Sequence, residues 1–589
     1  MHRRDSKVYE FNGFRLEVAQ QRLLYGGQPV PLKPKILDLL LYLVERRGEL
    51  VVKEDLMREV WADTIVEENN ITVSMSILRK TLGDQDKRQF IETVPRRGYR
   101  FLPAVTEISD GLPPVAVVAP PRTANVFEDE PIDSLAVLPT PSDGNDPNVD
   151  YLSEGIVESI INTLSRIRRL RVLACSTAFR FKSKDVDPQS VGVQLNVKGV
   201  MMIRVIRLGE KLIIRSELVK VSDGSQLWGE QYNRSPSDIL AIQEEIAKAI
   251  SDSLRFQLTS QDKMDLTRKP TENIEAYNLY LRGRYFWNKY DKEWVLKAIE
   301  AFEQAILIDA NYALAYCGLA DAYFRLSNLH FPPHEVLPKA KEAALRAVEI
   351  DDSLAEAHAS LAMLYVYYDH DWARAEREFK KTLELNPDLI TAHQRYGSYL
   401  TFMGRFEEAI RHYETAIELD PFSLQANMNL ATAYYLRGEH QRAVDNLTKA
   451  IELDPNYMPT RLVRGCTYIQ QGRLADAIAD FQHIYKLDEE AYLALGFMGH
   501  AHALAGELEE AETLLNILKE ISQRKYVSPY NMLLIHLGLG QPDRVFEILE
   551  QLYQERNDWL VWLKVSPELR ILHDDARFQN LLRRVGFRD

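Results

Sequence analysis

Residues 70–82 have the spacing of an amphipathic helix whose two faces differ in chemistry. At about 100° per residue, four apolar positions fall within roughly 40° of one another. They predict a buried stripe at Ile71, Met75, Leu78 and Leu82. The opposite face carries Val73, Ser76, Ile77 and Lys80, flanked by Thr72, Ser74 and Arg79. Side chains this short let a helix enter a DNA major groove, where apolar groups contact thymine methyls and serine bonds a base edge or a phosphate.

A basic tetrapeptide follows this helix, between two runs of strand-forming residues. Pro95-Arg96-Arg97-Gly98 separates Phe90–Val94 from Tyr99–Leu102, which predicts a hairpin with two arginines at its tip.

The preceding residues predict the elements that must hold this helix and hairpin. Strands are predicted at Val8–Leu16, Arg22–Tyr25 and Gln28–Val30, the last two joined by Gly26-Gly27. Helices are predicted from Pro34 to Gly48, over Lys53–Trp61 and over about Asn70–Leu82. A sheet, three helices and a basic hairpin make a winged-helix pattern, so we expect a DNA-binding domain over residues 7–104. The alternative for the third helix is a half-buried position beneath another domain.

Residues 7–104 resemble the OmpR/PhoB-type winged-helix family. The resemblance lies in Leu32–Leu43, Val66–Asp84 and Ile91–Phe101, and the Pro-Arg-Arg-Gly-Tyr hairpin is most similar to the ToxR/CadC branch. In that family the third helix lies in the major groove and the hairpin, called the wing, reaches the adjacent minor groove. The resemblance implies double-stranded promoter DNA as a partner, with a head-to-tail dimer on DNA as a candidate assembly and RNA polymerase as a further candidate partner.

The family's DNA contacts carry over position by position. Phosphate contacts are implied at Asn69, Asn70, Ser74 and Arg79. Base-facing positions are Val73, Ser76, Ile77 and Lys80, with Thr72 beside them. The wing positions are Arg96, Arg97 and Tyr99. Many relatives have arginines where this chain has Ser76 and Ile77, so the base preference does not carry over.

A proline-rich stretch separates this domain from a second set of strands and helices. Residues 106–131 hold five prolines, which predicts a flexible linker over residues 105–131. Strands are then predicted at Ser134–Leu138, Leu170–Ala174, Val197–Arg207, Lys211–Val221 and Ser225–Tyr232. Helices are predicted at Asp150–Ser165, Pro188–Leu195 and Ser237–Phe256. We therefore expect an α/β domain over residues 132–262.

Four segments of this middle region resemble the TolB-amino-terminal-like domain: SLAVLP, YLSEGIVESIINTLSRI, VLACSTAFRFK and DGSQLWGEQYNR. That module often lies between a signalling head and tetratricopeptide repeats. Met202-Ile203 stand where relatives commonly carry Glu-Gly, so a ligand of that dipeptide is not implied here. No nucleophile–base pair, phosphate-binding loop or metal-ligand spacing emerges, so we expect neither an enzyme nor a cofactor or metal site.

From residue 273 a 34-residue period predicts tetratricopeptide repeats. Pro387, Pro421 and Pro455 end copies that read AIELDP or close to it. A small residue recurs at Gly397, Ala431 and Gly465, an alanine at Ala409, Ala443 and Ala477, and a larger side chain at Tyr413, Leu447 and Phe481. Small residues let the two helices of a unit approach, and the proline ends the second helix. We expect about eight repeats over residues 273–556, then capping helices over residues 557–589 that include a helix at Leu569–Phe587.

In tetratricopeptide arrays the first helix of each unit lines the concave face. This register predicts a partner-binding groove lined by Met363, Val366, Gln394, Ser398, Met428, Thr432, Tyr435, Leu462, Cys466 and Ile469. These side chains are uncharged, so we expect an apolar helix or extended segment rather than a carboxylate tail. The occupant is either a separate protein or peptide, or part of this chain, which would provide autoinhibition. The remaining alternative is a narrow groove filled by its own side chains.

Charge is unevenly distributed along the 589 residues, whose net charge is −14. Residues 1–104 contain 18 Lys+Arg and 15 Asp+Glu, and the remaining residues contain 54 and 71. A basic head on an acidic body lets one end meet phosphate. Three cysteines without a Cys-x-x-Cys spacing favour a reducing cytosol. Apolar stretches are too short to span a bilayer, so we expect a soluble, cytoplasmic protein with no membrane partner.

Together these features predict a multidomain chain: a winged helix-turn-helix (α+β) domain, an α/β domain and an all-α tetratricopeptide solenoid. The combination is similar to soluble bacterial invasion-gene regulators, so we expect a one-component, sequence-specific DNA-binding transcription regulator. One alternative is an interaction scaffold whose winged helix binds protein, against which Lys80, Arg96 and Arg97 argue. The other is an enzyme in the middle domain, against which the lack of a catalytic constellation argues.

Overall fold

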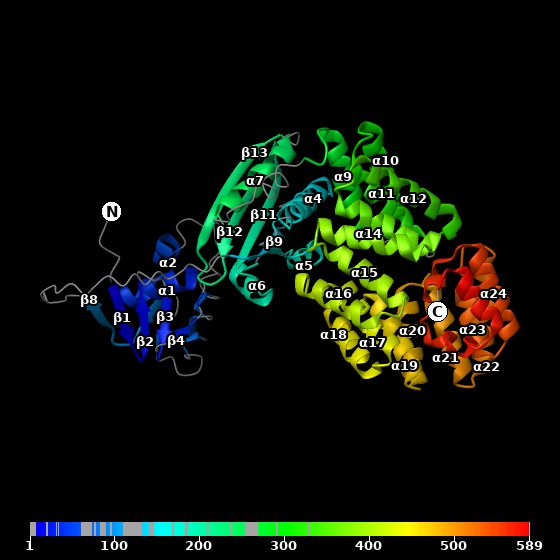
Figure 1. Cartoon of the computed structure of the whole chain (residues 1–589). Coiled ribbons are helices and arrows are strands. Elements are labelled where there is room, and N and C mark those ends of the chain that lie inside the picture. The colour runs from blue at the N-terminus through cyan, green and yellow to red at the C-terminus, as the bar shows by residue number, and fades with distance from the viewer. Residues whose placement is uncertain are drawn as a thin grey trace, which may run out of the picture. The chain divides into compact units, whose positions relative to one another are not determined.

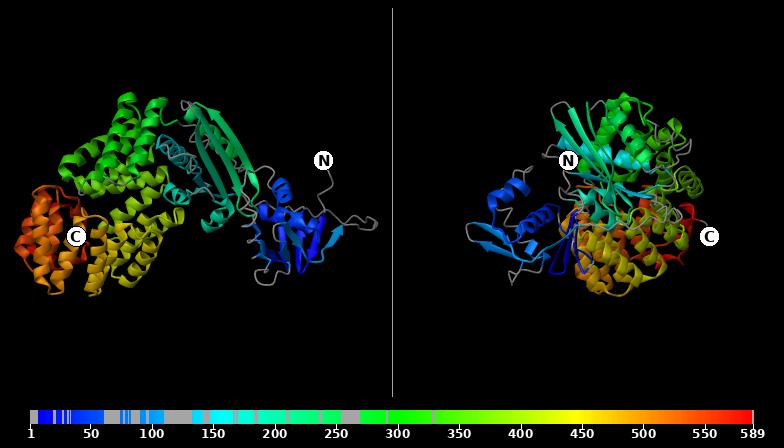
Figure 2. Two further views of the ribbon diagram at one scale, coloured as in Figure 1. Left: turned by 180° about the vertical axis from the view of Figure 1, so that it is seen from behind. Right: turned by 90° about the vertical axis from the view of Figure 1, so that its left-hand side faces the viewer.

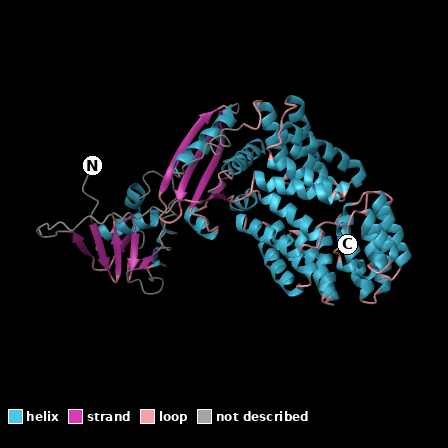
Figure 3. Ribbon diagram, in the orientation of Figure 1, coloured by secondary structure: helices cyan, strands magenta, loops and turns pink. Residues whose placement is uncertain are grey.

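The chain forms two compact units, Met1–Phe127 and Glu128–Asp589, in the computed structural model (Figure 1). The structure describes residues 7–18, 22–26, 28–30, 32, 34–60, 74–75, 78–79, 81–82, 90–94, 97–109, 132–140, 147–165, 167, 170–182, 186–208, 211–235, 238–253, 269–289, 292–327 and 330–587. Strands occur together with helices in the first unit and at the start of the second, and the remaining described elements are helices (Figure 3). The three expected fold classes are therefore confirmed in their expected order.

An antiparallel sheet opens the first unit. Its strands are β1 (Lys7–Phe11), β2 (Phe14–Glu17), β3 (Arg22–Tyr25), β4 (Gln28–Val30) and β8 (Thr106–Ser109), in the order β4-β3-β2-β1-β8. The predicted hairpin between β3 and β4 is confirmed.

Two predictions about this sheet were wrong. Residues 8–16 are not one strand, because Asn12 and Gly13 adopt positive φ values of 42° and 84° and turn β1 back into β2. This Asn-Gly pair is a strong hairpin signal that the alternation had masked. The expected linker does not begin at residue 105 either, because β8 pairs with β1 from Lys7–Ser109 to Glu10–Thr106.

A second, three-stranded sheet carries the wing. Its strands are β5 (Val51–Val52), β6 (Ile91–Val94) and β7 (Gly98–Phe101), in the order β5-β7-β6. The helices that precede the wing are α1 (Pro34–Glu45) and α2 (Lys53–Val60). The hairpin predicted between residues 90 and 102 is confirmed.

Aromatic rings join the two sheets of the first unit. Phe11 of β1 meets Phe101 of β7 at a centroid distance of 5.2 Å, and Phe14 of β2 meets Phe90 at 5.8 Å, both edge to face. All four rings are buried with Leu39 and its neighbours in α1. The wing is therefore anchored in the core of the unit rather than projecting from it as an independent loop.

The second unit begins with a mixed sheet. Its strands are β9 (Ser134–Thr140), β10 (Arg171–Val172), β11 (Gly199–Leu208), β12 (Lys211–Lys220) and β13 (Gln226–Arg234), in the order β10-β9-β11-β12-β13. β9 runs parallel to β10 and β11, and the other pairs are antiparallel. The strand predicted at Leu170–Ala174 is only two residues long, and the other predicted strands agree within a few residues.

Helices cover this sheet unequally. They are α4 (Pro147–Leu164), α5 (Cys175–Ala178), the 3-10 turn η1 (Phe179–Phe181), α6 (Pro188–Gln194) and α7 (Ile239–Ser253). α4 and α7 pack against each other and over the face that buries Met201, Ile203 and Ile214. On the opposite face, Arg215, Gln231 and other polar side chains of β12 and β13 are exposed.

Eight helix pairs follow in the described part of the chain. They are α9 (Ile274–Trp287) with α10 (Lys292–Ile308), α11 (Ala313–Leu326) with α12 (Pro333–Ile350), α13 (Ala355–Leu364) with α14 (Trp372–Leu385), α15 (Ile390–Phe402) with α16 (Phe406–Leu419), α17 (Leu424–Arg437) with α18 (His440–Leu453), α19 (Met458–Gln470) with α20 (Leu474–Leu487), α21 (Tyr492–Leu504) with α22 (Leu508–Ser522), and α23 (Pro529–Gly538) with α24 (Pro542–Gln554). A π-helical turn, η3 (Tyr365–Asp369), extends α13. The chain ends in two 3-10 helices, η4 (Asp558–Trp562) and η5 (Pro567–Leu572), and α25 (Ala576–Arg584).

Glycines let the two helices of a repeat touch, as the period predicts. A Cβ on Gly397 would lie 2.5 Å from the Tyr413 ring, and a Cβ on Gly465 would lie 2.5 Å from the Phe481 ring. Real Cβ atoms essentially never approach this closely, so only glycine fits at these two positions without a shift of the ring.

The middle domain shares a core with the first repeat (Figure 2). Tyr277 of α9 is buried against the middle domain and its hydroxyl donates to Gln243 Oε1 of α7 at 2.6 Å. Arg284 of α9 pairs with Glu158 of α4, Nη2 to Oε1, at 2.7 Å, and both side chains are largely buried. These contacts join the α/β domain to the start of the array.

A second contact lies three repeats later, at the end of the fourth. Asp420, at the end of α16, is 1% exposed and accepts hydrogen bonds from the hydroxyls of Ser176 and Thr177 in α5. Burial raises the pKa of Asp420, and these hydroxyl groups oppose that rise. Arg180 donates to the Leu453 carbonyl oxygen at 2.7 Å, and Phe181 packs edge to face on Phe422. The middle domain is therefore attached to the array at two separated places.

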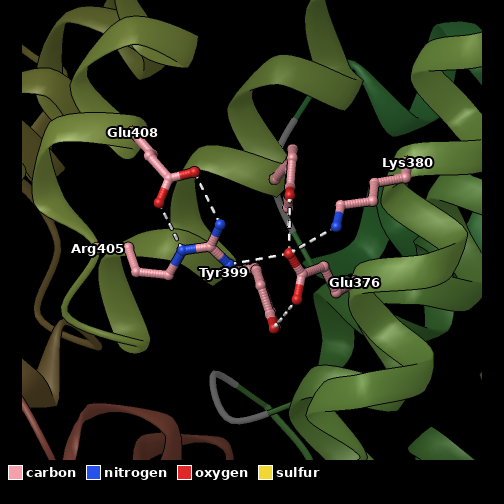
Figure 4. A network of polar contacts seen from close by, with 6 residues as sticks. Glu376, Lys380, Tyr399, Arg405 and Glu408 are labelled. Carbon is pink, nitrogen blue, oxygen red and sulfur yellow. Dashed lines mark hydrogen bonds and ion pairs between the residues drawn. The ribbon is translucent and has the colours of Figure 1, made fainter.

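An ionic network joins the third and fourth repeats (Figure 4). Glu376 of α14 accepts from Arg405 Nη1 at 2.9 Å and lies 3.1 Å from Lys380 Nζ, while Glu408 binds the other side of the same guanidinium. Burial alone would raise the pKa of Glu376, but the hydrogen bonds from Arg405 and Lys380 outweigh it and lower the pKa to about 2. Ionised Glu376 therefore stabilises the junction of the two repeats.

We expect Glu376→Gln to lower the free energy of unfolding of the array by about 2 kcal/mol at neutral pH. Because the pKa of Glu376 is lower in the folded state than its usual value of 4.5, the stabilisation is present above pH 4.5 and is lost as the pH falls towards 2. Scanning calorimetry at pH 7, 4 and 3 should show the difference in Tm between wild type and variant shrink in acid. The control is Glu384→Gln, at an exposed position of α14; equal effects of the two substitutions would refute a specific role for Glu376.

Candidate nucleic-acid interface and repeat groove

One arginine joins the third helix of the first unit to the wing. Arg79 Nη2 donates to the Ile91 carbonyl oxygen at 3.0 Å and to Thr93 Oγ1 at 2.6 Å, both in β6. Arg79 therefore holds the helix against the wing, a role that sequence reasoning missed. Its phosphate contact stays a prediction.

The described part of the third helix has the expected buried stripe. Met75, Leu78 and Leu82 are buried, whereas Ser74 and Arg79 are half-buried at the flanks. The other residues predicted to contact DNA from this segment lie outside the described residues: Asn69, Asn70, Thr72, Val73, Ser76, Ile77 and Lys80.

An arginine is exposed where the chain enters the second strand of the wing. Arg97 N–H donates to the Val94 carbonyl oxygen at 3.0 Å, and its side chain is exposed. Tyr99 is 5% exposed and pairs with Val51 and Thr93 across the small sheet, so its ring supports the wing from the core. Arg96 lies outside the described residues.

Gly98 is required where the wing begins its second strand. Its φ is +153°, and a Cβ there would lie 2.0 Å from the carbonyl oxygen of Val51. The obstacle is backbone of β5, which cannot rotate away as a side chain can. β5 and β7 therefore approach this closely only because residue 98 has no side chain.

We expect Gly98→Ala to destabilise the first unit by more than 2 kcal/mol and to weaken DNA binding together with stability, because β5 and β7 must separate. Gly26→Ala is the control, since Gly26 also has a positive φ, +57°, but has nothing within 4 Å of the added Cβ. It should cost only about 1 kcal/mol. Hydrogen exchange of the amides of residues 90–102 measures the effect; if both variants protect these amides equally, the close approach at Gly98 is not a constraint.

The second candidate surface is the concave side of the repeats. None of the ten predicted groove residues is exposed: Met363, Val366, Gln394, Ser398, Met428, Thr432, Tyr435, Leu462, Cys466 and Ile469 are buried or half-buried. Some of this burial comes from a neighbouring repeat, because Gln394 of α15 donates to Ser423 Oγ at the start of α17, whereas the Thr432 hydroxyl bonds within its own helix to the Met428 carbonyl oxygen.

The carboxy-terminal segment of the chain also contacts this side of the repeats. The Tyr435 hydroxyl donates to Glu568 Oε1 at 2.6 Å, and the Phe402 ring meets Trp562 edge to face at 4.6 Å. We call Arg556–Phe587 the tail. Sequence reasoning missed its contacts because no repeat period extends into it, although Trp559 and Trp562 are the kind of large aromatic residues that seek a partner surface.

The tail also reaches the third repeat. Arg556 Nη1 donates to the Tyr368 carbonyl oxygen at 3.1 Å. Trp372 of α14 donates from Nε1 to the Val585 carbonyl oxygen at 3.1 Å and stacks on Phe587 at 4.6 Å. The last residues of the chain thus lie against residues more than 200 positions earlier.

The other side of the tail packs on the last repeat. Arg584 of α25 forms two hydrogen bonds with Glu550 of α24, at 2.7 and 2.8 Å, and Arg577 lies 3.8 Å from the centre of the Phe546 ring. The single helix predicted at Leu569–Phe587 was wrong: η5 and α25 are separate, with Asp575 capping α25 by accepting from the Arg577 backbone N–H. The tail therefore joins the last repeat to the third, fourth and fifth.

We expect Trp562→Ala to open the concave face by removing the contact with Phe402. Trp562 is half-buried, so loss of its ring should cost about 2 kcal/mol, less than a fully buried aromatic group, and hydrogen exchange in α13, α15 and α17 should rise about tenfold. Trp559→Ala is the matched control, since Trp559 stacks on Tyr530 of α23 at 4.4 Å. It should affect α23 and α24 instead. Identical exchange patterns for the two variants would show that the tail only caps the last repeat.

The described residues contain no group of three His, Cys, Asp or Glu side chains placed to hold a metal ion. Nor does any described helix combine the length and apolar character that a bilayer span needs.

Two parts of the chain match known protein families. Residues 27–101 match the family "Transcriptional regulatory protein, C terminal", and residues 397–457 and 468–532 match tetratricopeptide repeat families. The chain therefore carries an OmpR/PhoB-type DNA-binding domain and tetratricopeptide repeats. The resemblance of the middle domain to the TolB-amino-terminal-like module stays a prediction.

Three curated relatives match different lengths of this chain. "Transcriptional regulator HilA" of Salmonella typhimurium is 26% identical over 413 residues, covering 69% of each chain. "Transcriptional activator CadC" of Escherichia coli is 36% identical over 87 residues, covering 14% of this chain and 17% of that protein. "Putative adenylate cyclase 3" of Rhizobium meliloti is 28% identical over 232 residues, which cover 39% of this chain but only 40% of that protein. Similarity to HilA and CadC supports a function in transcription regulation.

Proposed function

We propose that this protein is a one-component transcription regulator that binds promoter DNA through its first unit. The observation that carries the proposal is the wing: Arg97 is exposed at its tip, and Arg79 ties the third helix to its first strand. A rigid helix–wing pair with a cationic tip suits simultaneous contact with a major groove and the adjacent phosphates. The match of residues 27–101 to a transcription-regulator family supports the same function.

The proposed contacts divide by chemistry. Arg96 and Arg97 neutralise phosphates or enter the minor groove, and Asn69, Asn70, Ser74 and Arg79 position the backbone. Lys80 lies on the base-facing side, where its charge attracts DNA of any sequence. Val73, Ser76 and Ile77, with Thr72 beside them, face the bases, and Tyr99 supports the wing. We place the protein in the cytoplasm because such a regulator must reach the chromosome. A dimer on DNA and a contact with RNA polymerase are parts of the same proposal.

We propose that the repeats bind a protein partner and that the tail is the resident occupant of the predicted groove. Support comes from Glu568 and Trp562, which contact Tyr435 and Phe402 on the first helices of two repeats. A partner that uses the same face must compete with an intramolecular segment whose effective concentration is high. Binding at this face is therefore regulated by release of the tail.

We also propose that the middle domain is not catalytic, although one relative is named as a cyclase. Its buried polar groups serve packing: Glu158 pairs with Arg284, and Thr177 binds Asp420. Burial raises the pKa of the Cys175 thiol, which disfavours the reactive thiolate.

The DNA-binding proposal is tested with the full chain on a set of duplexes. Log affinity should fall linearly with log salt, and Arg97→Ala or Lys80→Ala should weaken binding to all sequences and reduce the salt slope by about 1. Ile77→Ala should instead change which sequence is preferred. Arg22→Ala is the control, because it removes one positive charge from β3 of the same unit. Affinity that is independent of salt and unchanged by the three interface variants would overturn the proposal.

A further inference from the structure

The mixed sheet of the second unit has two unequal edges. β10, at one edge, has only two residues, and Arg171 in it donates to the Glu418 carbonyl oxygen of the fourth repeat at 3.0 Å. β13, at the other edge, has nine residues and is the outermost strand in Figure 1. Seven of its side chains are exposed, and only Trp228 and Tyr232 are not.

The strand pairing determines which backbone groups of β13 point outward. Lys220 N–H of β12 donates to Ser225, on the β13 side, and Val221 N–H donates to Lys198, on the β11 side. Because successive residues of an antiparallel strand bond alternately to the two neighbours, the even-numbered residues of β12 bond to β13. Ile214 is opposite Tyr232 and Ser216 is opposite Glu230, so even-numbered residues of β13 point inward. The amide groups of Gly229, Gln231 and Asn233 therefore point away from the sheet.

This edge lacks most of the usual protection against pairing. Folded proteins blunt an edge strand with lysine, proline or a bulge. The sequence QLWGEQYNR contains neither lysine nor proline. A bulge is present only at Leu227, near the first residue of the strand. From Trp228 to Arg234 the strand is a regular template for another strand.

The charges of β13 are complementary to those of a second β13. An antiparallel pair centred on Tyr232 places Glu230 opposite the partner's Arg234, and the symmetric pair repeats this contact. Both side chains are exposed, and Glu230, whose Oε2 accepts from the Tyr232 hydroxyl at 3.0 Å, keeps its other oxygen for a partner. In the same register Gln231 and the partner's Asn233 form a hydrogen-bonded pair with the outward amides. A pair centred on Glu230 would oppose two glutamates, and one centred on Gln231 would oppose Glu230 to a tyrosine.

We propose that β13 pairs with β13 of a second copy of this chain, centred on Tyr232, so that the two sheets continue across the dimer. Four backbone hydrogen bonds between Gln231 and Asn233 and two Glu230–Arg234 ion pairs hold the interface. This interface would form the dimer that the proposed function includes. Only its effect on DNA binding rests on that function: two DNA-binding units in one dimer bind neighbouring half-sites with increased effective concentration.

The test is sedimentation velocity of the full chain, without DNA, over a series of micromolar concentrations. Wild type should show a reversible monomer–dimer equilibrium. Glu230→Arg and Arg234→Glu should each raise the dimer Kd at least tenfold, because like charges then face each other at both ion pairs. Glu217→Arg is the control, since it makes the same charge change at an exposed position of β12, and it should leave the Kd unchanged.

Mixing the two charge variants makes the test specific. In a heterodimer of Glu230→Arg with Arg234→Glu, each arginine again faces a glutamate, so an equimolar mixture should recover dimers that neither variant forms alone. Asn233→Pro removes an outward N–H without touching the bonds to β12, and it should also prevent dimerisation. A monomeric wild type, or charge variants that dimerise as wild type does, would overturn the proposal. A mixture that stays monomeric while circular dichroism shows folded chains would overturn it as well. DNA binding plays no part in these readouts, so failure of the dimer leaves the DNA-binding test unaffected.

Discussion

The burial of the Glu158–Arg284 pair sets the architecture of the second unit. A carboxylate and a guanidinium leave water together only if their geometry is good and their remaining hydrogen-bonding groups are satisfied. Here the pair is reinforced by the bond from Tyr277 to Gln243, and Gly155 lets α4 approach Leu281, whose side chain would lie 3.1 Å from an added Cβ. Because the first repeat is fixed in this way, the rotation accumulated along the following repeats determines where each later one lies. Asp420 can meet Ser176 and Thr177 only with that starting orientation.

The same reasoning applies to the other end of the array. Solenoids normally have two free ends, and each repeat contacts only its neighbours. In this chain the tail contacts the third, fourth and fifth repeats as well as the eighth, through Trp372, Phe402 and Tyr435 on one side and Glu550 on the other. The array therefore gains long-range contacts that a stack of repeats touching only their neighbours does not have.

The sequence predicts well what depends on local periodicity. The buried stripe of Met75, Leu78 and Leu82 follows from helical geometry, and the Gly397–Tyr413 and Gly465–Phe481 contacts follow from a 34-residue period. It predicts poorly what depends on pairing between distant segments. β8 looks like linker because four residues of moderate strand propensity form a strand only when β1 is beside them. The tail contacts were missed for the same reason, since nothing in the spacing of Trp562 or Glu568 indicates which repeat they meet. For the DNA-binding face, the pattern and the family resemblance predict the contact positions, whereas the link from Arg79 to Thr93 is seen only in the folded structure.

Closure by the tail has a consequence for biosynthesis. Trp372 and Val585 are 213 residues apart in the chain, yet they are joined by a hydrogen bond. A ribosome that adds 5–20 residues per second needs roughly 10–40 s to cover that interval. During this time the concave face of the third to fifth repeats has left the exit tunnel without its covering segment, and apolar side chains such as Phe402 stay accessible to chaperones.

The array also cannot gain or lose a repeat freely in evolution, because one additional 34-residue unit would carry Trp562 and Glu568 past the repeats that they cover.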